Sequence, residues 1–270
     1  MAGEEGQWRW RTVAITGASS GLGAAFATVL AAPGRRLWLA GRDAARLGAV
    51  AAACRAAGAR VEEAAFDVRD AAACSAWAAG DPGEPLDLLI ANAGVSAGTG
   101  GAAEPTEQVA RIVAVNLTGA LNTALPALAR MRGQPPGPDG VRGRVAVVAS
   151  VAAFVAAPGA PAYCASKAAL QRWAEATDAT ARRGGVRVHA ICPGYVRTPM
   201  TAANDFPMPW LMEPEDAARR GLRGVAAGRA RVAYPWPLYA LARVVGAMPP
   251  AWLSALPAKG RGGVEASGDR

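Results

Sequence analysis

Short apolar runs alternate along the chain with longer stretches in which apolar residues recur at helical spacing. Short apolar runs between turn signals are typical of strands buried in a parallel sheet, and the longer stretches are typical of helices. The alternation predicts one α/β domain, a Rossmann-type doubly wound parallel sheet with helices on both faces. The predicted strands are 12–15, 36–40, 60–66, 86–90, 144–149 and 186–192, and the predicted helices are 22–32, 44–57, 107–131 and 162–182.

After Pro193 the alternation of strands and helices becomes less regular. Residues 200–212 are interrupted by prolines and rich in Met, Phe and Trp. Residues 215–227 predict a helix, and residues 231–234 predict a last strand. Residues 235–256 are apolar and contain several prolines, which we expect to prevent one continuous amphipathic helix.

These patterns divide the chain into two parts of unequal size. We expect residues 1–235 to form the Rossmann-type domain, which includes the less regular segment at about 199–228. Residues 236–270 form an apolar, proline-rich extension with a frayed polar tail. The tryptophans and leucines that surround Arg243 suit a subunit interface, a substrate entrance or a membrane surface. The prolines favour packing against protein over membrane contact.

The chain is basic. It has 270 residues, with 29 Lys or Arg against 21 Asp or Glu, a formal net charge of +8 and a pI of about 10.0. Such a balance suits nucleic acid, anionic lipid or an anionic cofactor. The arginines are spread along the chain instead of forming one long run, which argues against nucleic acid as a partner.

The spacing of the cysteines and the hydropathy of the chain indicate whether the protein binds a metal and in which compartment it works. Cys54, Cys74, Cys164 and Cys192 lie far apart, so neither a metal site nor a redox pair is indicated. The chain contains no uninterrupted apolar run of the length that spans a membrane. Its start is acidic and then basic, unlike a signal peptide. Because reduced thiols are typical of the cytoplasm, we expect a cytoplasmic protein without a metal.

A glycine-rich turn follows the first predicted strand and opens a helix, with Gly17, Gly21 and Gly23 after Thr16. Glycine lets the backbone approach a pyrophosphate closely, and a helix N-terminus offers unpaired amides and a positive dipole end. The turn therefore predicts a dinucleotide site, although glycines also occur where a chain merely turns from strand to helix. The other residues of the turn that we expect to contact a ligand are Ser19, Ser20 and Leu22.

Tyr163 and Lys167 are four residues apart in a predicted helix, and Ser150 follows the preceding strand. Lys167 and Lys259 are the only lysines in a chain that otherwise uses arginine. A lysine ammonium beside a phenol lowers the pKa of the phenol by favouring the phenolate. The pair therefore predicts a proton donor and acceptor that works near neutral pH. Taken alone, the same spacing also describes a packing pair on one helix face.

Together these motifs resemble the classical short-chain dehydrogenase/reductase family. The resemblance spans residues 16–198 and departs from the family's pattern at Ala91, where an asparagine is usual. It implies a Rossmann-fold enzyme that moves a hydride between a nicotinamide cofactor and a carbonyl or secondary alcohol compound. The matching residues, in the family's order and spacing, are Thr16, Gly17, Gly21, Gly23, Asp67, Val68, Asn92, Ala93, Gly94, Asn116, Ser150, Tyr163, Lys167, Pro193 and Gly194.

The resemblance implies a role for each of four side chains. Tyr163 is the acid in carbonyl reduction and the base in alcohol oxidation, and Lys167 stabilises its phenolate and binds the nicotinamide ribose. Ser150 holds the substrate oxygen, and Asn116 positions a water that connects the lysine to solvent. One assembly thus accounts for four residues that each have a structural explanation when taken singly.

The end of the second predicted strand favours NADP over NAD as the cofactor. An acidic residue there would bind the adenosine ribose of NAD, but the strand ends in Gly41 and Arg42. Arginine can hold a 2′-phosphate bidentately and stack on adenine. We expect Asp43, the next residue, to cap the following helix. The other cofactor contacts that the resemblance implies are Asp67, Val68, Asn92, Ala93, Gly94, Pro193, Gly194, Val196 and Thr198.

Fewer residues indicate how the substrate is bound than indicate how the cofactor is bound. By resemblance, a lid at about 199–228 covers the ligand site, and within it residues 200–212 close over the nicotinamide. The apolar side chains of residues 200–212 suit an apolar pocket wall. Packing of this segment on its own domain explains the same residues equally well. We therefore expect a small-molecule carbonyl or alcohol with apolar bulk. The candidate wall residues are Phe206, Met208, Trp210, Leu211 and Met212.

Three further expectations follow from the sequence. His189, the only histidine, lies in a predicted buried strand with no nucleophile motif nearby, which indicates a structural role. A catalytically idle NADP-binding sensor or scaffold is the alternative to an enzyme, and the complete set of four side chains argues against it. Relatives are commonly dimers or tetramers through the helices that bear Asn116 and Tyr163, so the resemblance implies a homodimer or homotetramer.

Overall fold

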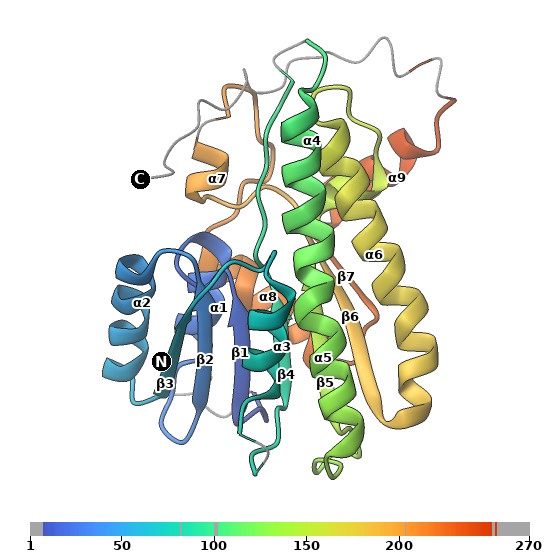
Figure 1. Cartoon of the computed structure of the whole chain (residues 1–270). Coiled ribbons are helices and arrows are strands. Elements are labelled where there is room, and N and C mark those ends of the chain that lie inside the picture. The colour runs from blue at the N-terminus through green and yellow to red at the C-terminus, as the bar shows by residue number, and fades with distance from the viewer. Residues whose placement is uncertain (1–7, 82, 100–101, 203, 250–251, 253–270) are drawn as a thin grey trace.

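A seven-stranded parallel sheet forms the centre of the molecule, with the order β3-β2-β1-β4-β5-β6-β7 (Figure 1). The structure is a computed structural model that describes residues 8–81, 83–99, 102–202, 204–249 and 252. The strands are β1 (Thr12–Thr16), β2 (Arg36–Gly41), β3 (Arg60–Ala65), β4 (Leu88–Ala91), β5 (Gly143–Val148), β6 (Val186–Pro193) and β7 (Arg231–Tyr234).

Helices connect successive strands, and the strand order reverses between β1 and β4. Ligands of doubly wound sheets bind at the carboxyl ends of the strands near such a reversal. Two 3₁₀ turns, η2 (Val151–Phe154) and η3 (Arg182–Gly184), and a π-helical turn, η1 (Ala114–Gly119), accompany the helices. The helices are α1 (Gly21–Leu30), α2 (Ala44–Ala56), α3 (Ala71–Ala79), α4 (Thr106–Val113), α5 (Ala120–Gly133), α6 (Pro161–Ala181), α7 (Pro199–Ala202), α8 (Pro214–Ala226) and α9 (Trp236–Gly246).

Apolar layers cover both faces of the sheet. Successive strand residues point to opposite faces. Val13 and Ile15 therefore pack with side chains of α1, α2 and α8, whereas Ala14 packs with side chains of α3, α5 and α6. β4 is buried along its whole length, as its uninterrupted apolar sequence predicts. β3 is mostly exposed because it lies at the edge of the sheet.

The predicted strands and helices are confirmed, with boundaries that differ by at most two residues, for example at the start of β4. The sequence pattern missed α3, because its alanine-rich sequence has little contrast between apolar and polar positions. Asp70 caps α3 by accepting a hydrogen bond from the backbone N–H of Ala73 at 2.9 Å. The predicted helix 107–131 is one helical run made of α4, η1 and α5.

The prediction that prolines prevent one continuous amphipathic helix over residues 235–256 is confirmed for the described residues, where a helix, α9, covers only Trp236–Gly246. α9 forms there because Pro237 lies in the first turn, where the missing backbone N–H has no intrahelical partner to lose. Pro249 comes only after the helix has ended. Most of the remaining extension, residues 250–251 and 253–270 with Lys259, lies outside the described residues.

The helical run Thr106–Gly133 has the length and mean hydropathy, 1.5, of a membrane-spanning helix. Half of its most apolar window is buried inside the protein. The run packs against α3, α6 and the strands β4 and β5. Its apolar character therefore follows from its place in the helical layer.

Candidate active site

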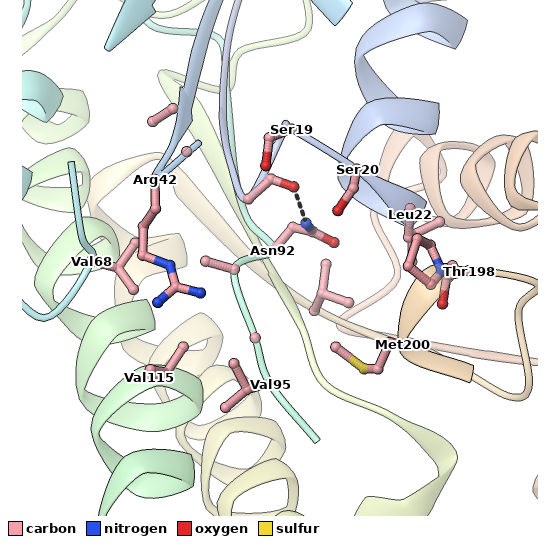
Figure 2. A pocket seen from close by; sticks show the side chains of 18 of the residues that line it. Ser19, Ser20, Leu22, Arg42, Val68, Asn92, Val95, Val115, Thr198 and Met200 are labelled. Carbon is pink, nitrogen blue, oxygen red and sulfur yellow. Dashed lines mark hydrogen bonds between the residues drawn. The ribbon is translucent and has the colours of Figure 1, made fainter. Parts of the chain in front are cut away.

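A cleft of about 770 Å³ lies at the carboxyl ends of the strands, beside the reversal between β1 and β4. Its walls come from the segments that follow β1 to β6, so residues far apart in sequence meet there (Figure 2). Of the residues predicted to bind a cofactor, those that line the cleft are Gly17, Ser19, Ser20, Gly21, Leu22, Arg42, Asp67, Val68, Asn92, Ala93, Gly94, Tyr163, Lys167, Pro193, Gly194, Val196 and Thr198.

The first turn of α1 at the cleft is suited to an anion. Its N-cap residue, Ser20, makes no side-chain capping hydrogen bond, and the turn carries no acidic residue. The amides at this end therefore keep their donors for a ligand, and the dipole of α1 favours negative charge there. Ser19 and Ser20 project toward the cleft beside this turn (Figure 2). These features fit the pyrophosphate of a dinucleotide.

Two glycines allow close packing beneath the turn. Gly17 has a φ of +65°, and a Cβ there would lie 2.8 Å from the Cα of Ala93. A Cβ on Gly23 would lie 2.1 Å from the carbonyl oxygen of Gly17. Gly23 is absent from the cleft walls. Gly23 therefore lets α1 pack closely against the turn. It does not line the cleft, so the direct cofactor contact predicted for Gly23 is not observed in this structure.

The Asn92 side chain connects the ends of β1 and β4. Its Nδ2 donates to the carbonyl oxygens of Thr16 at 3.1 Å and Gly17 at 3.2 Å. The hydroxyl of Thr16 accepts in return from the backbone N–H of Asn92 at 3.2 Å. The floor of the cleft is thereby fixed across the reversal in strand order.

Arg42 projects into one end of the cleft from the end of β2 (Figure 2). Its guanidinium lies 3.9 Å from the carboxylate of Asp67, which also pairs with Arg69 at 2.8 Å. Hydrogen bonds from Arg69 hold the pKa of Asp67 below its ordinary value, against the opposing effect of burial. Because Asp67 already accepts from Arg69, positive charge on Arg42 remains for an anionic ligand.

The prediction that Asp43 caps α2 is confirmed. Its Oδ1 accepts from the backbone N–H of Arg46 at 2.9 Å, and its carboxylate pairs with the Arg46 side chain at 2.7 Å. Arg46 and Arg69 also line this end of the cleft, and the sequence did not single them out. Nothing distinguishes them from the many other arginines until β2 and β3 bring their loops together.

Asn116 lies in the π-helical turn η1 and is fully buried. Its side chain exchanges two hydrogen bonds with the backbone of Val95, at 2.8 and 2.9 Å, and donates to the Ser166 hydroxyl at 3.2 Å. A Cβ on Gly94 would lie 3.3 Å from Asn116 Oδ1 and 3.4 Å from Lys167 Nζ. Asn116 Oδ1 and Lys167 Nζ thus both lie close to Gly94, and π-helical turns such as η1 are frequent at functional sites.

Ser150, Tyr163 and Lys167 come together at the end of β5 and the start of α6. The Ser150 hydroxyl is buried, accepts from the backbone N–H of Ala152 at 3.1 Å and hydrogen-bonds the Tyr163 phenol. Lys167 lies one helical turn after Tyr163, with its Nζ 5.8 Å from the centroid of the tyrosine ring. The same ammonium donates to the carbonyl oxygen of Val148 at 2.8 Å.

Burial changes the acidity of both groups. It raises the pKa of the Tyr163 phenol, and the hydrogen bond to Ser150 acts in the opposite direction. It lowers the pKa of Lys167 to about 8. The lowering of the phenol pKa that the sequence predicts is therefore not produced by Lys167 alone. A second positive charge at the site, such as an oxidised nicotinamide, has to favour the phenolate as well.

We expect kcat/KM for carbonyl reduction to fall as the pH rises through about 8, the pKa of Lys167. Burial lowers this pKa from 10.5, so the ammonium form is present below about pH 8 and is lost above it. The pH profile of kcat/KM reports ionisations of the free enzyme, so it is the measurement to make. In Lys167→Arg, whose side chain stays charged, kcat/KM should not fall as the pH rises through about 8. If kcat/KM still falls near pH 8 in Lys167→Arg, the ionisation belongs to another group.

Glu104 caps the helix that carries Tyr163. The N-cap residue of α6 is Ala160, which has no side-chain acceptor. Glu104 Oε2 instead accepts from the backbone N–H of Ala162 at 2.9 Å, while its Oε1 accepts from Gln108 at 2.9 Å. This carboxylate lies 58 residues before Ala162 in sequence, so no local capping motif could reveal it.

His189 is fully buried in β6, as predicted, and is absent from the cleft walls. Its Nδ1 lies 2.7 Å from the carbonyl oxygen of Arg229, and burial lowers its pKa to about 4. The imidazole is therefore neutral at physiological pH and part of the core. The four cysteines are buried and unpaired. Among the described residues, no three His, Cys, Asp or Glu side chains group as a metal site would require.

The fold and the cleft define the protein as a dinucleotide-binding protein of the Rossmann type. A family model described as short chain dehydrogenase matches residues 11–207. The chain therefore belongs to the short-chain dehydrogenase/reductase family, and it is an NAD(P)-dependent oxidoreductase.

Relatives of this chain agree with that assignment. An uncharacterized oxidoreductase of Myxococcus xanthus is 39% identical over 247 residues, which cover 89% of this chain and 93% of the relative. A short-chain dehydrogenase from Sphingobium yanoikuyae in complex with NADPH is 28% identical, with a TM-score of 0.74 over 89% of this chain and 97% of its own. A family member from Burkholderia phymatum in complex with NAD is 25% identical, with a TM-score of 0.75 over 87% and 92%.

Proposed function

We propose that this enzyme reduces a carbonyl compound with NADPH, or oxidises the corresponding secondary alcohol with NADP⁺. The observation that carries the proposal is that Tyr163 and Lys167 line a cleft that Arg42 also lines, with Ser150 next to the Tyr163 phenol. Hydride exchange with the carbonyl carbon is the chemistry that a bound nicotinamide would supply. The side chains of this protein would position the carbonyl and move the proton.

In this proposal, the phenol of Tyr163 donates a proton to the carbonyl oxygen during reduction and takes it back during oxidation. The Ser150 hydroxyl holds the same oxygen and stabilises negative charge as it develops. Positive charge on Lys167 would stabilise the phenolate that remains, until a proton from solvent restores the phenol. Asn116, whose Oδ1 lies close to Gly94 as Lys167 Nζ does, would support the water that links the lysine to solvent.

The preference for NADP(H) rests on the end of β2. Gly41 leaves no carboxylate where the ribose of NAD would need one, and Arg42 supplies a guanidinium suited to a 2′-phosphate. Arg46 and Arg69 line the same end, each paired with a carboxylate, that of Asp43 or Asp67, so that Arg42 supplies the net positive charge there. The Sphingobium relative is in complex with NADPH and the Burkholderia relative with NAD, so the family accommodates both cofactors.

Arg42→Ala should weaken NADPH binding by about tenfold or more and leave NADH binding nearly unchanged, because only NADPH carries the 2′-phosphate. Fluorescence titration with both cofactors measures the two affinities. Arg55→Ala is a matched control, since Arg55 is a half-exposed arginine of α2 that pairs with Glu63 and is absent from the cleft walls. Equal losses for both cofactors in Arg42→Ala would refute the proposed preference.

The substrate side is formed in part by the segment after β6. Met200 and Thr201 line the cleft, and Phe206 packs edge-on against Tyr195 with ring centroids 6.0 Å apart. Of the other predicted wall residues, Met212 pairs with Val196 and packs against the core. Trp210 is half exposed. We therefore propose an apolar substrate wall built from the first part of the segment.

The proposed covering segment is residues 199–213. The wider range expected from the sequence, 199–228, includes α8, whose residues Ala217, Leu222 and Val225 are fully buried in the core beside α1. A helix that forms part of the core cannot open and close over a cleft without unfolding that core.

A screen of NADPH oxidation across aldehydes, ketones, quinones, sugars and acyl thioesters tests the proposed function. Turnover of at least one carbonyl class that depends on Tyr163 supports it. Tight NADPH binding without turnover of any class would refute it. We also propose a cytoplasmic homodimer or homotetramer, and light scattering in solution would measure its mass.

A further inference from the structure

α9 carries apolar side chains on two faces. Leu238 and Ala242 are buried against the protein. On the opposite face, Leu241 and Val244 are 50% and 62% exposed. Trp236 at the start of the helix is 73% exposed, and two large apolar side chains after its end are also exposed. We call these exposed side chains the α9 stripe: Trp236, Leu241, Val244, Met248 and Trp252.

The sequence around the stripe is basic and free of acidic residues. No Asp or Glu occurs between Asp216 and Glu265, an interval that contains seven arginines and one lysine. Arg243 supplies a cation within α9 itself, where it also lies over the Phe154 ring. A surface of this composition complements anionic lipid headgroups, because each basic residue near such a membrane adds to the attraction.

The composition of the stripe suits a bilayer surface better than a protein partner. Tryptophans, which are enriched at the interface between lipid and water, lie at both of its ends. Leucine, valine and methionine lie between them, as on helices that rest in the headgroup region. The tail of the chain does not offer an apolar cover, since residues 257–270 contain Val264 as their only large apolar residue.

The stripe lies at the substrate end of the molecule. Figure 1 shows α7 and α9 at the same end, beyond the carboxyl ends of the strands. α9 packs against η2, the turn that follows Ser150, and Gly246 approaches the backbone of Phe154 closely. Met200 and Trp210, in the proposed covering segment, are 37% and 50% exposed. A surface that receives the stripe would therefore adjoin the route to the cleft.

We propose that the α9 stripe docks this enzyme on the surface of an anionic lipid bilayer. The apolar side chains enter the headgroup region, and Arg243, the cation within α9, contacts the headgroups. This differs from the expectation drawn from the prolines of residues 235–256, which favoured packing against protein over membrane contact. The proposal does not depend on the catalytic chemistry, because none of the stripe residues lines the cleft.

Co-sedimentation of the full chain with vesicles of phosphatidylcholine and phosphatidylglycerol tests this. The wild type should bind these vesicles, and Leu241→Ser combined with Val244→Ser should bind at least about tenfold more weakly. Leu125→Ser is the matched control, since Leu125 is 53% exposed on α5. It should bind as the wild type does. Brominated lipid chains should quench tryptophan fluorescence in the wild type and less in the double variant.

Failure of the wild type to bind the vesicles would overturn the proposal, as would equal binding by the double variant. Light scattering of the same proteins without lipid shows whether a second copy of the chain covers the stripe instead. If the double variant loses mass there and the wild type ignores vesicles, the stripe joins two copies of the chain instead. Turnover of a water-soluble ketone is measured in parallel and should be unchanged in the double variant, so the result on docking is read separately from the proposed function.

Discussion

Tyr163→Phe is expected to lower kcat for carbonyl reduction by about a hundred- to ten-thousandfold, the contribution typical of a positioned general acid. The substitution removes only the phenolic oxygen, which hydrogen-bonds Ser150. The ring stays in place, and Lys167 keeps its hydrogen bond to the Val148 carbonyl. NADPH affinity should therefore change by no more than about twofold. Steady-state kinetics together with fluorescence titration separate the two effects.

Tyr234→Phe provides the control for this experiment. Tyr234 is a buried tyrosine of β7 whose hydroxyl has no hydrogen-bond partner among the described residues. Removing that hydroxyl should leave turnover unchanged. Full turnover in Tyr163→Phe would move the proton donor to another group and contradict the mechanism.

Gly23→Ala should weaken cofactor binding by about tenfold or more, because the glycine turn and α1 can no longer pack together beneath the ligand. The added Cβ would lie 2.1 Å from the Gly17 carbonyl oxygen and 2.5 Å from Asn92 Nδ2. Either the glycine turn or α1 has to move, and both form the pyrophosphate end of the cleft. We also expect the free energy of unfolding to fall by about 1–3 kcal/mol, as for other overpacked sites.

Gly133→Ala is the matched control, since Gly133 is also helical and a Cβ there meets nothing within 4 Å. Its stability should not fall, because alanine favours a helix over glycine. Urea denaturation and NADPH titration of both variants measure the two quantities. Unchanged affinity in Gly23→Ala would mean that the turn does not form the cofactor site.

Most of the sheet could be predicted because its central strands are short, uninterrupted apolar runs. β1 and β4 are buried on both faces, and this condition leaves a clear mark in sequence. The residues of the cleft could be predicted for a similar reason. The carboxyl ends of parallel strands meet at one edge, so motifs that follow successive strands have to converge.

Features that depend on tertiary contacts could not be predicted. Glu104 caps α6 from 58 residues away, and Arg69 gains its place at the cleft only through the pairing of β2 with β3. α9 forms despite its prolines because their positions at its first turn and beyond its end matter more than their number. The net direction of the Tyr163 pKa also depends on burial, which a spacing of four residues does not reveal.

The π-helical turn that holds Asn116 has a consequence for how this fold can lose its function. A π turn contains one residue more than an α turn, so the ladder of hydrogen bonds can close without it. Deleting a single residue from η1 would join α4 to α5 as an ordinary helix, and the apolar faces of both would keep their phase. One deletion could therefore convert this enzyme into a stably folded binder of dinucleotides that has lost the polar amide beside its lysine.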